Sequence, residues 1–482
     1  MDNMFLTGCL APATQECTAT DLTVTGTIPD YLDGRYVRNG PNPVGEIDPD
    51  TYNWLTGDGM VHGVRIRDGH AQWYRNRWIR TPRVRAALGE QPTRTTRHPA
   101  GMQFLGANTS VIEHGGRTLA LVESGVATIE LTDELDTVGP HDFDGTLSGG
   151  YTAHPKRDPA TGELHAVSYS FSRGNTVQYS VIGTDGRARR TVDIEVDGSP
   201  MMHNFSLTEN YVVLYDLPVT LAPGLAAEVT VPRPLRLPAK LVLSALIGRV
   251  RMPDPMTALL DRRMQPNHRL PYRWNPEHQA RVGILPREGT ADQVRWFEVE
   301  PCYVFHPLNA YEDGDTIVLD LARHSSTFDT NLAGPVAVPT LDRWTVDLTG
   351  GKVREERLDD RGQEFPKADD RLLGRRHRYG YTVAGTGAER PFDALIKHDF
   401  TGGSAITRDF GSTAYASEFA FVPAHADAAE DEGVLMGFIH DSSIGRSDLL
   451  LLDAGTLDTV ATIQLPNRVP GGFHGEWLPT HP

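Results

Sequence analysis

The sequence HGGRTLALV at residues 114–122 decides the fold class of this chain. The glycine pair at its start is a strong signal for the tight turn of a β-hairpin. The residues after the turn form a short run that is apolar or β-branched, which is typical of a buried strand. The stretch therefore predicts a hairpin whose second strand lies in the protein interior.

The same unit, a tight turn flanked by short apolar runs, recurs along the chain. Further turn signals lie at residues 67–69, 184–186, 312–314, 349–351 and 401–403, and further strand-like runs at residues 211–215, 316–319 and 449–452. Strand patterns do not alternate with helical patterns, so a parallel doubly wound sheet is not expected. We predict an all-β fold, and so many hairpins in 482 residues favour a propeller over a sandwich.

The composition limits the classes of function. Lys+Arg total 46 and Asp+Glu total 63, and the net charge of −17 argues against a nucleic-acid partner and favours an enzyme of a neutral or apolar substrate. The three cysteines, Cys9, Cys17 and Cys302, indicate no disulfide framework and fit a reducing compartment such as the cytoplasm. We expect neither a signal peptide nor a membrane-spanning segment, because the first twenty residues have no basic start and no apolar run is long enough.

One segment, at about residues 217–265, departs from the hairpin pattern. Between the prolines of residues 232–264, leucines recur at mixed helical spacing, which predicts one or two short helices. The preceding residues 217–232 carry only one charge, Glu228. Two interpretations stay open: a cap packed over the blades, or an apolar patch that contacts membrane lipid or admits an apolar substrate.

Four histidines, His154, His203, His306 and His474, each end a strand-like segment. They are separated by 49, 103 and 168 residues, or one, two and more than three times the length of a propeller blade, which is about 45 residues. This regularity predicts a metal on a central axis. A four-coordinate zinc with four His ligands would be a closed structural site, whereas octahedral ferrous iron would keep two positions open for dioxygen or water.

Three glutamates lie in apolar, strand-like contexts where an unpaired carboxylate would be costly: Glu123, Glu364 and Glu418. A metal-bound histidine usually donates its other ring N–H to a carboxylate or carbonyl group, which fixes the orientation of the ring. These glutamates are therefore the best candidates to support the histidines. His62 and His440 occur in similar local sequences, so the residues alone do not exclude them as ligands.

The motifs around these residues provide a further discriminator. The runs DLTVTGTIP (residues 21–29), LDGRYVRNGPNP (32–43) and GDGMVH (57–62) resemble the opening of the carotenoid cleavage oxygenase family. The resemblance covers essentially the whole chain, through ANT (107–109), ALVE (120–123), YTAHP (151–155), MHNF (202–205), FHPLNA (305–310), EFP (364–366), RYGY (378–381), EFAFVP (418–423) and GFHG (472–475).

The resemblance implies a seven-bladed β-propeller formed by residues 1–482 as one domain, with the segment at about 217–265 capping it and lining the substrate entrance. It implies one Fe(II) per chain on the axis, with no carboxylate ligand. Carried over by position, the ligands are His154, His203, His306 and His474, with Glu123, Glu364 and Glu418 behind them and Thr109 near the vacant metal position. His62 and His440 fall outside the ligand motifs.

The activity that the resemblance implies is oxidative cleavage of a C=C double bond in an apolar conjugated substrate, with O2 and no organic cofactor. A tunnel that positions one alkene beside the metal would then set which bond is cleaved. Residues beside the metal motifs are candidates to line this tunnel, although strand residues of these types more often pack in a core. They are Phe104, Val122, Met201, Phe305, Phe365 and Phe473.

The substrate follows less directly from the sequence. One branch of the family cleaves carotenoids and apocarotenoids, whereas another cleaves stilbenes or phenylpropenoids and recognises a phenol with a Tyr and a Lys, the Lys directly preceding the first glutamate. Val122 occupies that position here, which favours a polyene. A stilbenoid or phenylpropenoid oxygenase, and a propeller that binds or isomerises a polyene without cleavage, stay open. A polyene substrate also fits peripheral membrane contact through residues 217–262 of a cytoplasmic protein.

Overall fold

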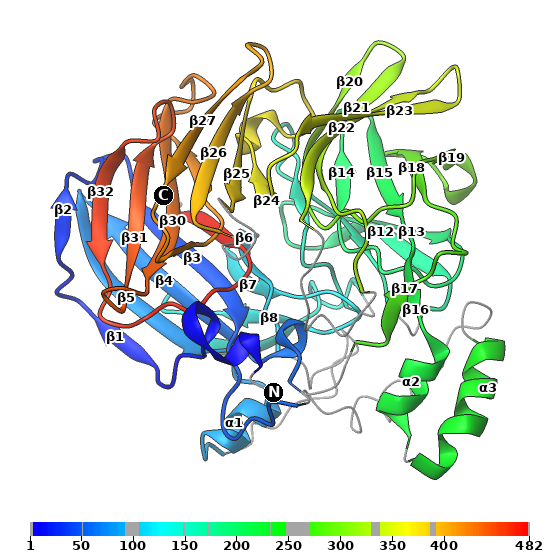
Figure 1. Ribbon diagram of the computed structural model, residues 1–482, viewed down its shortest axis with the longest axis horizontal. Helices are drawn as coiled ribbons and strands as arrows, with labels where there is room; N and C mark the ends of the chain where they lie inside the picture. Colours follow the sequence, from blue (N-terminus) through cyan, green and yellow to red (C-terminus); the bar gives the residue numbers. More distant parts are fainter. Residues whose placement is uncertain are drawn as a thin grey trace.

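The computed structural model describes residues 3–50, 52–91, 106–147, 150–170, 173–231, 233–246, 270–328, 338–385 and 392–480. Within these ranges the chain forms seven antiparallel sheets of four to six strands and one sheet of two strands. Figure 1 shows the larger sheets following one another around the molecule. The predicted seven-bladed β-propeller is therefore confirmed.

The first four blades take their strands from the first two-thirds of the chain and from its C-terminal end. Blade one has the order β1-β5-β4-β3-β33 and consists of β1 (Cys17–Ala19), β3 (Gly34–Pro41), β4 (Gly59–Arg67), β5 (His70–Trp78) and β33 (Gly475–Pro479). Blade two consists of β6 (Ser110–His114), β7 (Arg117–Leu121), β8 (Thr128–Leu131) and β9 (Thr137–His141). Blade three consists of β10 (Lys156–Arg157), β11 (Leu164–Ser168), β12 (Thr176–Ile182) and β13 (Ala188–Glu195). Blade four consists of β14 (Phe205–Leu207), β15 (Tyr211–Asp216), β18 (Arg281–Pro286) and β19 (Arg295–Glu298).

The other three blades complete the ring. Blade five consists of β20 (Pro307–Asp313), β21 (Thr316–Arg323), β22 (Thr340–Asp347) and β23 (Lys352–Asp359). Blade six consists of β24 (Gln363–Lys367), β25 (Tyr379–Ala384), β26 (Ala394–Asp399) and β27 (Ser404–Asp409). Blade seven consists of β2 (Val24–Gly26), β28 (Ala414–Ala416), β29 (Ala420–Pro423), β30 (Gly433–Asp441), β31 (Arg446–Asp453) and β32 (Thr459–Gln464).

The two ends of the chain close the ring. Near the C-terminus, β33 pairs with β3 of the first blade, with Arg38 opposite Gly475. Near the N-terminus, β2 pairs with β32 of the last blade, with Thr25 opposite Thr462. Each of these blades therefore contains strands from both ends of the sequence, and this exchange holds the ring together without leaving an open sheet edge between its ends.

The turns predicted from glycine pairs and Asp-Gly pairs join neighbouring strands of a blade. In the turn between β4 and β5, Asp68 and Gly69 have φ angles of 51° and 70°. The glycines at 115 and 116 between β6 and β7 have φ angles of 58° and 73°. Positive φ at both central residues is the requirement of a type I′ turn, whose twist matches that of the flanking strands. The hairpin predictions at these positions are confirmed.

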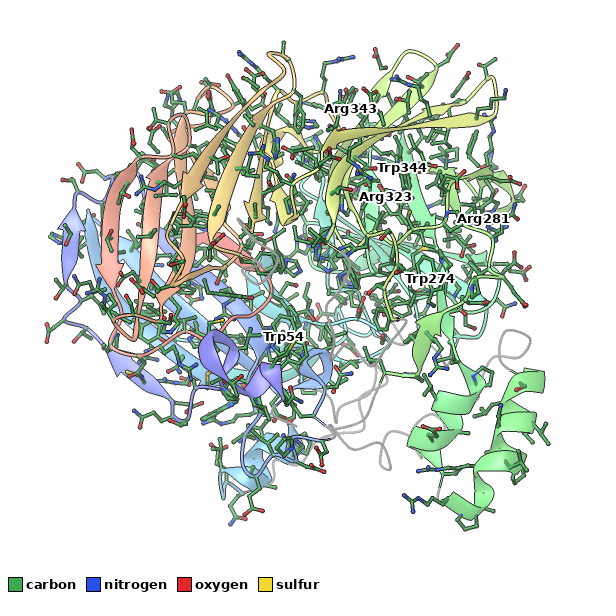
Figure 2. All side chains as sticks on the ribbon, in the orientation of Figure 1. Trp54, Trp274, Arg281, Arg323, Arg343 and Trp344 are labelled. Carbon is green, nitrogen blue, oxygen red and sulfur yellow. The ribbon has the colours of Figure 1, made fainter. Side chains whose placement is uncertain are left out.

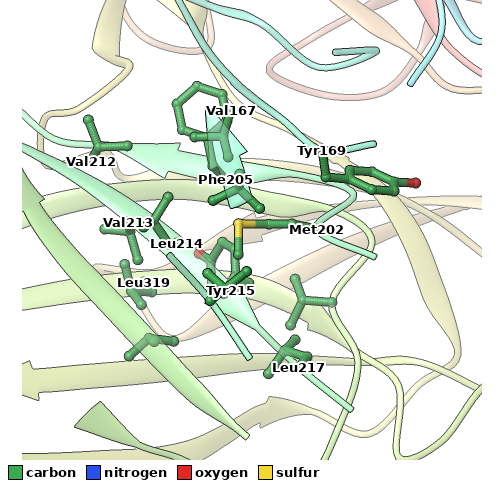
Figure 3. Close-up of a cluster of buried hydrophobic side chains, with 14 of the residues drawn as sticks. Val167, Tyr169, Met202, Phe205, Val212, Val213, Leu214, Tyr215, Leu217 and Leu319 are labelled. Carbon is green, nitrogen blue, oxygen red and sulfur yellow. The ribbon is translucent and has the colours of Figure 1, made fainter. Parts of the chain in front are cut away.

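The largest buried cluster lies among blades three, four and five. It includes Tyr179, Phe205 and Trp344, which are at most 1% exposed. Figure 3 shows Met202 and Phe205 side by side with strand residues of blade four. Because Met202 and Phe205 flank residues 203 and 204, this core fixes the chain where it enters β14.

Within the described ranges the helices are few and short. They are α1 (Pro82–Ala87), α2 (Pro223–Thr230) and α3 (Arg236–Leu246), with 3₁₀ turns at η1 (Met4–Leu6), η2 (Gly8–Leu10), η3 (Trp54–Thr56), η5 (Arg233–Leu235), η6 (Ala291–Gln293) and η7 (Asp370–Leu372). The predicted helix within residues 232–264 is observed as α3, whereas α2 lies in the preceding apolar stretch, where no helix was predicted. The remainder of that prediction, residues 247–264, lies outside the described residues.

The helical segment is an insertion within blade four. It follows β16 (Val219–Leu221) and precedes β17 (Tyr272–Trp274), which pair with each other in the two-stranded sheet. Figure 1 shows α2 and α3 packed beside each other at the periphery of the molecule, next to this small sheet. None of the helices in the described ranges is long and apolar enough to cross a membrane.

Candidate metal centre

The four predicted histidine ligands occupy equivalent positions in four blades. His154 and His203 lie two residues before β10 and β14, and His306 and His474 lie one residue before β20 and β33. These are the terminal strands of their sheets. Terminal strands of this set contact those of neighbouring blades, for example β14 with β20 and β6 with β33. They are therefore the strands nearest the axis. Each histidine lies where such a strand begins, so the prediction that each one ends a strand was wrong.

The other three blades place further predicted residues at the same level. Thr109 directly precedes β6, Glu364 is the second residue of β24, and Glu418 lies between β28 and β29. Each of the seven blades thus contributes one predicted polar side chain from the start of its axial strand. Glu123 is the exception in position, because it follows β7, the second strand of blade two.

The histidine rings converge on one point. The Nε2 atom of His203 lies 2.9 Å from Nε2 of His154 and 3.4 Å from Nε2 of His306. One ring nitrogen from each of His154, His306 and His474 lies within 4.8 Å of the others. Nitrogen ligands about 2.1 Å from one ion lie about 3 Å apart when adjacent. The observed separations are close to that value, so this group could hold a metal ion.

Three of the histidines are held from behind by the three predicted glutamates. The Nδ1 atom of His203 lies 2.9 Å from Oε2 of Glu123. The corresponding distance from His306 to Glu364 is 2.5 Å, and His474 lies 3.1 and 3.2 Å from the two oxygens of Glu418. No glutamate partner of His154 is found among the described residues. A carboxylate at Nδ1 fixes that nitrogen as the donor and leaves Nε2 with a lone pair.

The charge state of the rings follows from their burial. Burial lowers the pKa of His306 to about 4, although Glu364 acts in the opposite direction. Burial and the three neighbouring histidines lower the pKa of His154 well below its ordinary value. Both rings are therefore neutral at pH 7, which is the form that binds a metal ion.

Glu364 and Glu418 remain ionised despite their burial. Burial alone would raise the pKa of Glu418, but Lys367 and His474 lower it to about 2. For Glu364, the pKa is likewise held well below its usual range, because His306 and His324 outweigh the effect of burial. Backbone N–H groups assist, since Phe365 donates to Glu364 at 2.6 Å and Gly475 donates to Glu418 at 2.9 Å.

Two of the aromatic residues predicted for the tunnel, Phe305 and Phe365, lie against ligand rings. Phe365 stacks on His306 at a centroid distance of 5.3 Å and lies 5.6 Å from His474. Phe305 meets His203 edge to face at 5.2 Å. Phe473 directly precedes His474 and packs against Trp54 at 4.6 Å.

Two further residues predicted for the tunnel are buried in apolar clusters. Met201 and Val122 belong to buried core clusters and are 3% and 8% exposed. For Val122 the neighbours are core residues of the first two blades, such as Val61 and Ile129. Phe104 lies outside the described residues. Thr109 is 8% exposed, and its hydroxyl donates to Oδ1 of Asn108 at 3.0 Å.

The two rival histidines have hydroxyl partners within their own blades. Nδ1 of His62 lies 2.9 Å from the hydroxyl of Tyr74 in blade one. In blade seven, Nδ1 of His440 lies 3.1 Å from the hydroxyl of Ser447. Neither residue belongs to the histidine group at the axis.

Two residues near the histidine group were not predicted from the sequence. His324 follows β21, is 5% exposed and places Nε2 2.9 Å from Oε1 of Glu364. Trp54 (Figure 2) stacks on Phe5 at 5.4 Å, and its indole N–H is buried and has no partner among the described residues. Both contact their partners across a long stretch of sequence, so no local spacing could have revealed them.

Comparisons with known proteins bear on this centre. The family model described as retinal pigment epithelial membrane protein matches residues 10–479. The chain is 57% identical to a carotenoid cleavage oxygenase of Mycobacterium tuberculosis over 494 residues, which cover 99% of this chain and 98% of that protein. Two solved structures are also similar. A cobalt-substituted apocarotenoid oxygenase of Synechocystis aligns with a TM-score of 0.79 and 25% identity over 97% of both chains. A lignostilbene dioxygenase of Pseudomonas brassicacearum aligns with a TM-score of 0.80 and 26% identity, over 99% of this chain and 98% of that one.

Proposed function

This chain belongs to the retinal pigment epithelial membrane protein family, the family of the carotenoid cleavage oxygenases, and we propose that it cleaves a C=C double bond of a carotenoid or apocarotenoid. The reaction uses O2 and one non-haem Fe(II) per chain, and the products are aldehydes or ketones. The proposed ligands are His154, His203, His306 and His474, and Glu123, Glu364 and Glu418 orient three of them.

The contact between His203 and His306 carries the proposal of a metal ion. Each ring places Nδ1 against a glutamate, so in the neutral form, which is the form that binds a metal, both Nε2 atoms carry lone pairs. These two acceptors face each other at 3.4 Å and cannot form a hydrogen bond. Two lone pairs at this distance repel each other in a buried site unless a cation lies between them. Burial keeps His306 neutral at pH 7, because its pKa is about 4.

The donor set favours ferrous iron among the metals that imidazole binds. Four neutral nitrogen ligands leave an octahedral ion with two open positions, where a bound ferrous ion would supply the site that binds and activates dioxygen. The ionised Glu364 and Glu418 compensate part of its positive charge without binding it directly. The aromatic side chains of Phe305 and Phe365 exclude water and hold an apolar alkene beside the centre.

A polyene is the substrate class that the surroundings favour. Val122 stands where phenol-recognising relatives have a lysine, and it is 8% exposed among aliphatic residues. A valine offers no hydrogen-bond donor to a phenol at this position. The similarity to a lignostilbene dioxygenase supports the second candidate, cleavage of a stilbenoid or phenylpropenoid alkene.

One experiment separates these candidates. The Fe(II)-loaded protein is incubated under O2 with an apocarotenal and, in parallel, with a hydroxystilbene, and the products are identified by mass. We expect new aldehydes of lower mass than the apocarotenal. The same protein should give no such products without oxygen. Aldehydes from the hydroxystilbene alone would favour the second candidate. Substrate that is bound but recovered intact or isomerised in both samples would contradict cleavage.

We also propose peripheral membrane contact through the helical segment. Leu237, Leu241 and Val242 of α3 are 70%, 66% and 56% exposed, and Arg236 and Lys240 lie on the same helix. An amphipathic helix with exposed leucines and basic residues binds the interface of an anionic bilayer. We expect the protein to sediment with anionic vesicles and Leu241→Glu to weaken this. Val138→Glu, at another exposed apolar residue, is the control, and equal binding by both variants would contradict the contact.

A further inference from the structure

His324 is a buried histidine that belongs to none of the four ligand positions. It lies directly after β21 in blade five and is 5% exposed. Its backbone forms reciprocal hydrogen bonds of 2.8 Å with Tyr303, three residues before the ligand His306. The chain that leads into the ligand is thus fixed to the chain that carries His324.

The side chain of His324 hydrogen-bonds the second carboxylate oxygen of Glu364. Oε2 of Glu364 accepts from Nδ1 of His306 at 2.5 Å and from the amide of Phe365 at 2.6 Å. Oε1 accepts from Nε2 of His324 at 2.9 Å. Glu364 comes from blade six, whereas both histidines come from blade five. The carboxylate is therefore clamped between two rings of the neighbouring blade, and its rotation is restricted at both oxygens.

The tautomer of His324 follows from its partners. Its Nδ1 atom is buried and has no hydrogen-bond partner within the described part of the chain. The Nε2 atom lies 2.9 Å from Oε1 of Glu364, so a proton on Nε2 is donated to that oxygen. The ring therefore makes one polar contact, and that contact is directed at the carboxylate behind a metal ligand.

The same ring also supports a second ligand through an apolar contact. Phe305 meets His324 edge to face at a centroid distance of 5.1 Å, and Phe305 meets His203 edge to face at 5.2 Å. Removal of the imidazole would leave Oε1 of Glu364 without its donor and would loosen the packing of Phe305. His203 and His306 would both lose part of their support.

We propose that His324 is a positioning residue of the metal centre, which fixes Glu364 and through it directs the Nε2 lone pair of His306 toward the metal. This inference rests on the proposed metal centre. Removing partners of this kind usually costs about 10- to 100-fold in metal affinity. A histidine that only stabilised the fold would leave the affinity of the folded protein unchanged.

The test compares metal binding by His324→Leu, His324→Gln and the wild type. Affinity for Co(II) is measured by competition with a chelator, and the visible absorption of the Co(II) complex reports its geometry. We expect His324→Leu to bind about 10- to 100-fold more weakly with an altered spectrum. His324→Gln should bind nearly as well as the wild type, because its amide can still donate to Glu364.

The control is His165→Leu, at a buried histidine of blade three that pairs with the hydroxyl of Tyr179. His165→Leu should lower the free energy of unfolding without changing the affinity for Co(II). Wild-type affinity and spectrum in His324→Leu, or an equal loss in His324→Gln, would overturn the inference. Failure of the wild type to bind Co(II) would instead overturn the metal centre itself, and the inference with it. Should His324→Leu not fold, His324→Asn, whose amide is too short to reach Glu364, replaces it.

Discussion

The backbone N–H of Asn39 donates a hydrogen bond of 3.1 Å to the carbonyl oxygen of His474, and the N–H of Phe473 donates in return to Asn39 at 3.0 Å. A strand from the start of the chain thereby holds a proposed metal ligand from its end. The side chain of Asn39 extends the link to blade two, since it donates to the carbonyl of Ala107 at 3.0 Å. The pairing that closes the ring therefore also positions one member of the histidine group.

Metal binding should stabilise the propeller. An ion bound by four histidines would connect four blades, and a ligand that binds only the folded state raises its stability by about 4 kcal/mol at 1,000 times its dissociation constant. We expect Fe(II) under anaerobic conditions to raise the midpoint of thermal unfolding. His306→Ala should abolish this rise, whereas His440→Ala, at a buried histidine away from the axis, should retain it. A rise that persists in His306→Ala would contradict the ligand assignment.

Gly472→Ala should disrupt the segment that carries His474. A Cβ atom at Gly472 would overlap Nη1 of Arg38, a side chain that is 1% exposed and donates to the carbonyl of Pro470 at 2.5 Å. Overpacking of this kind costs about 1–3 kcal/mol or more. We expect a lower urea midpoint and weaker metal binding.

The matched control is Gly224→Ala in α2, where the nearest atoms to a new Cβ lie 3.8 Å away. In a helix this change is neutral or stabilises by up to about 1 kcal/mol. The two variants could instead have the same urea midpoint and the same metal affinity. That result would contradict the prediction that the close contact between Gly472 and Arg38 positions His474.

Replacing the carboxylate of Glu418 should weaken metal binding without unfolding the protein. In Glu418→Gln the side chain keeps its shape but loses the charge that pairs with His474 and Lys367. We expect a loss of about 10- to 100-fold in Fe(II) affinity, measured by chelator competition. Glu432→Gln, at a side chain that is 54% exposed, is the control. An unchanged affinity in Glu418→Gln would show that this carboxylate does not tune its histidine.

Acid should destabilise the protein through buried histidines far from the metal. Burial lowers the pKa of His165 and of His398 to about 4. In the unfolded chain their pKa is about 6.5, so between pH 6.5 and 4 the unfolded state binds more protons. Stability is therefore complete above pH 6.5 and falls as the pH approaches 4, by on the order of 3 kcal/mol for each histidine.

Urea unfolding at a series of pH values checks this. The variant His165→Gln should lose less stability than the wild type between pH 6.5 and 4.5. The variant His425→Gln changes a side chain that is 58% exposed and should follow the wild type. Identical pH profiles for all three proteins would contradict the assignment of the acid sensitivity to His165.

The local features of the structure could be predicted from the sequence. Glycine turns such as the one at residues 115 and 116 have a requirement for positive φ that is visible in the residues themselves. The spacing of the histidines predicted the axial site only in part, because His203 and His306, 103 residues apart, lie in adjacent blades, and blade four is lengthened by the helical insertion. The spacing did not distinguish His62 or His440 from the ligands, and only the family motifs did so.

Contacts between blades could not be predicted in this way. His324 reaches Glu364 from a different blade, and Trp54 stacks on Phe5, which belongs to the N-terminal 3₁₀ turn. Each contact joins two segments that are not neighbours in the sequence, so no local pattern encodes it. Helix α2 was missed for a different reason. Its residues carry too little charge contrast to produce a periodic pattern, and its contact with α3 supports it instead.

The most direct test of the four-histidine centre is X-ray absorption at the iron edge, measured on the wild-type protein reconstituted anaerobically with Fe(II). We expect one ferrous ion per chain with four imidazole nitrogens at about 2.1 Å, in the usual range for metal–imidazole bonds, and no protein carboxylate in direct contact. A spectrum with fewer than four imidazoles, or with a carboxylate oxygen of a glutamate bound to the iron, would contradict the account.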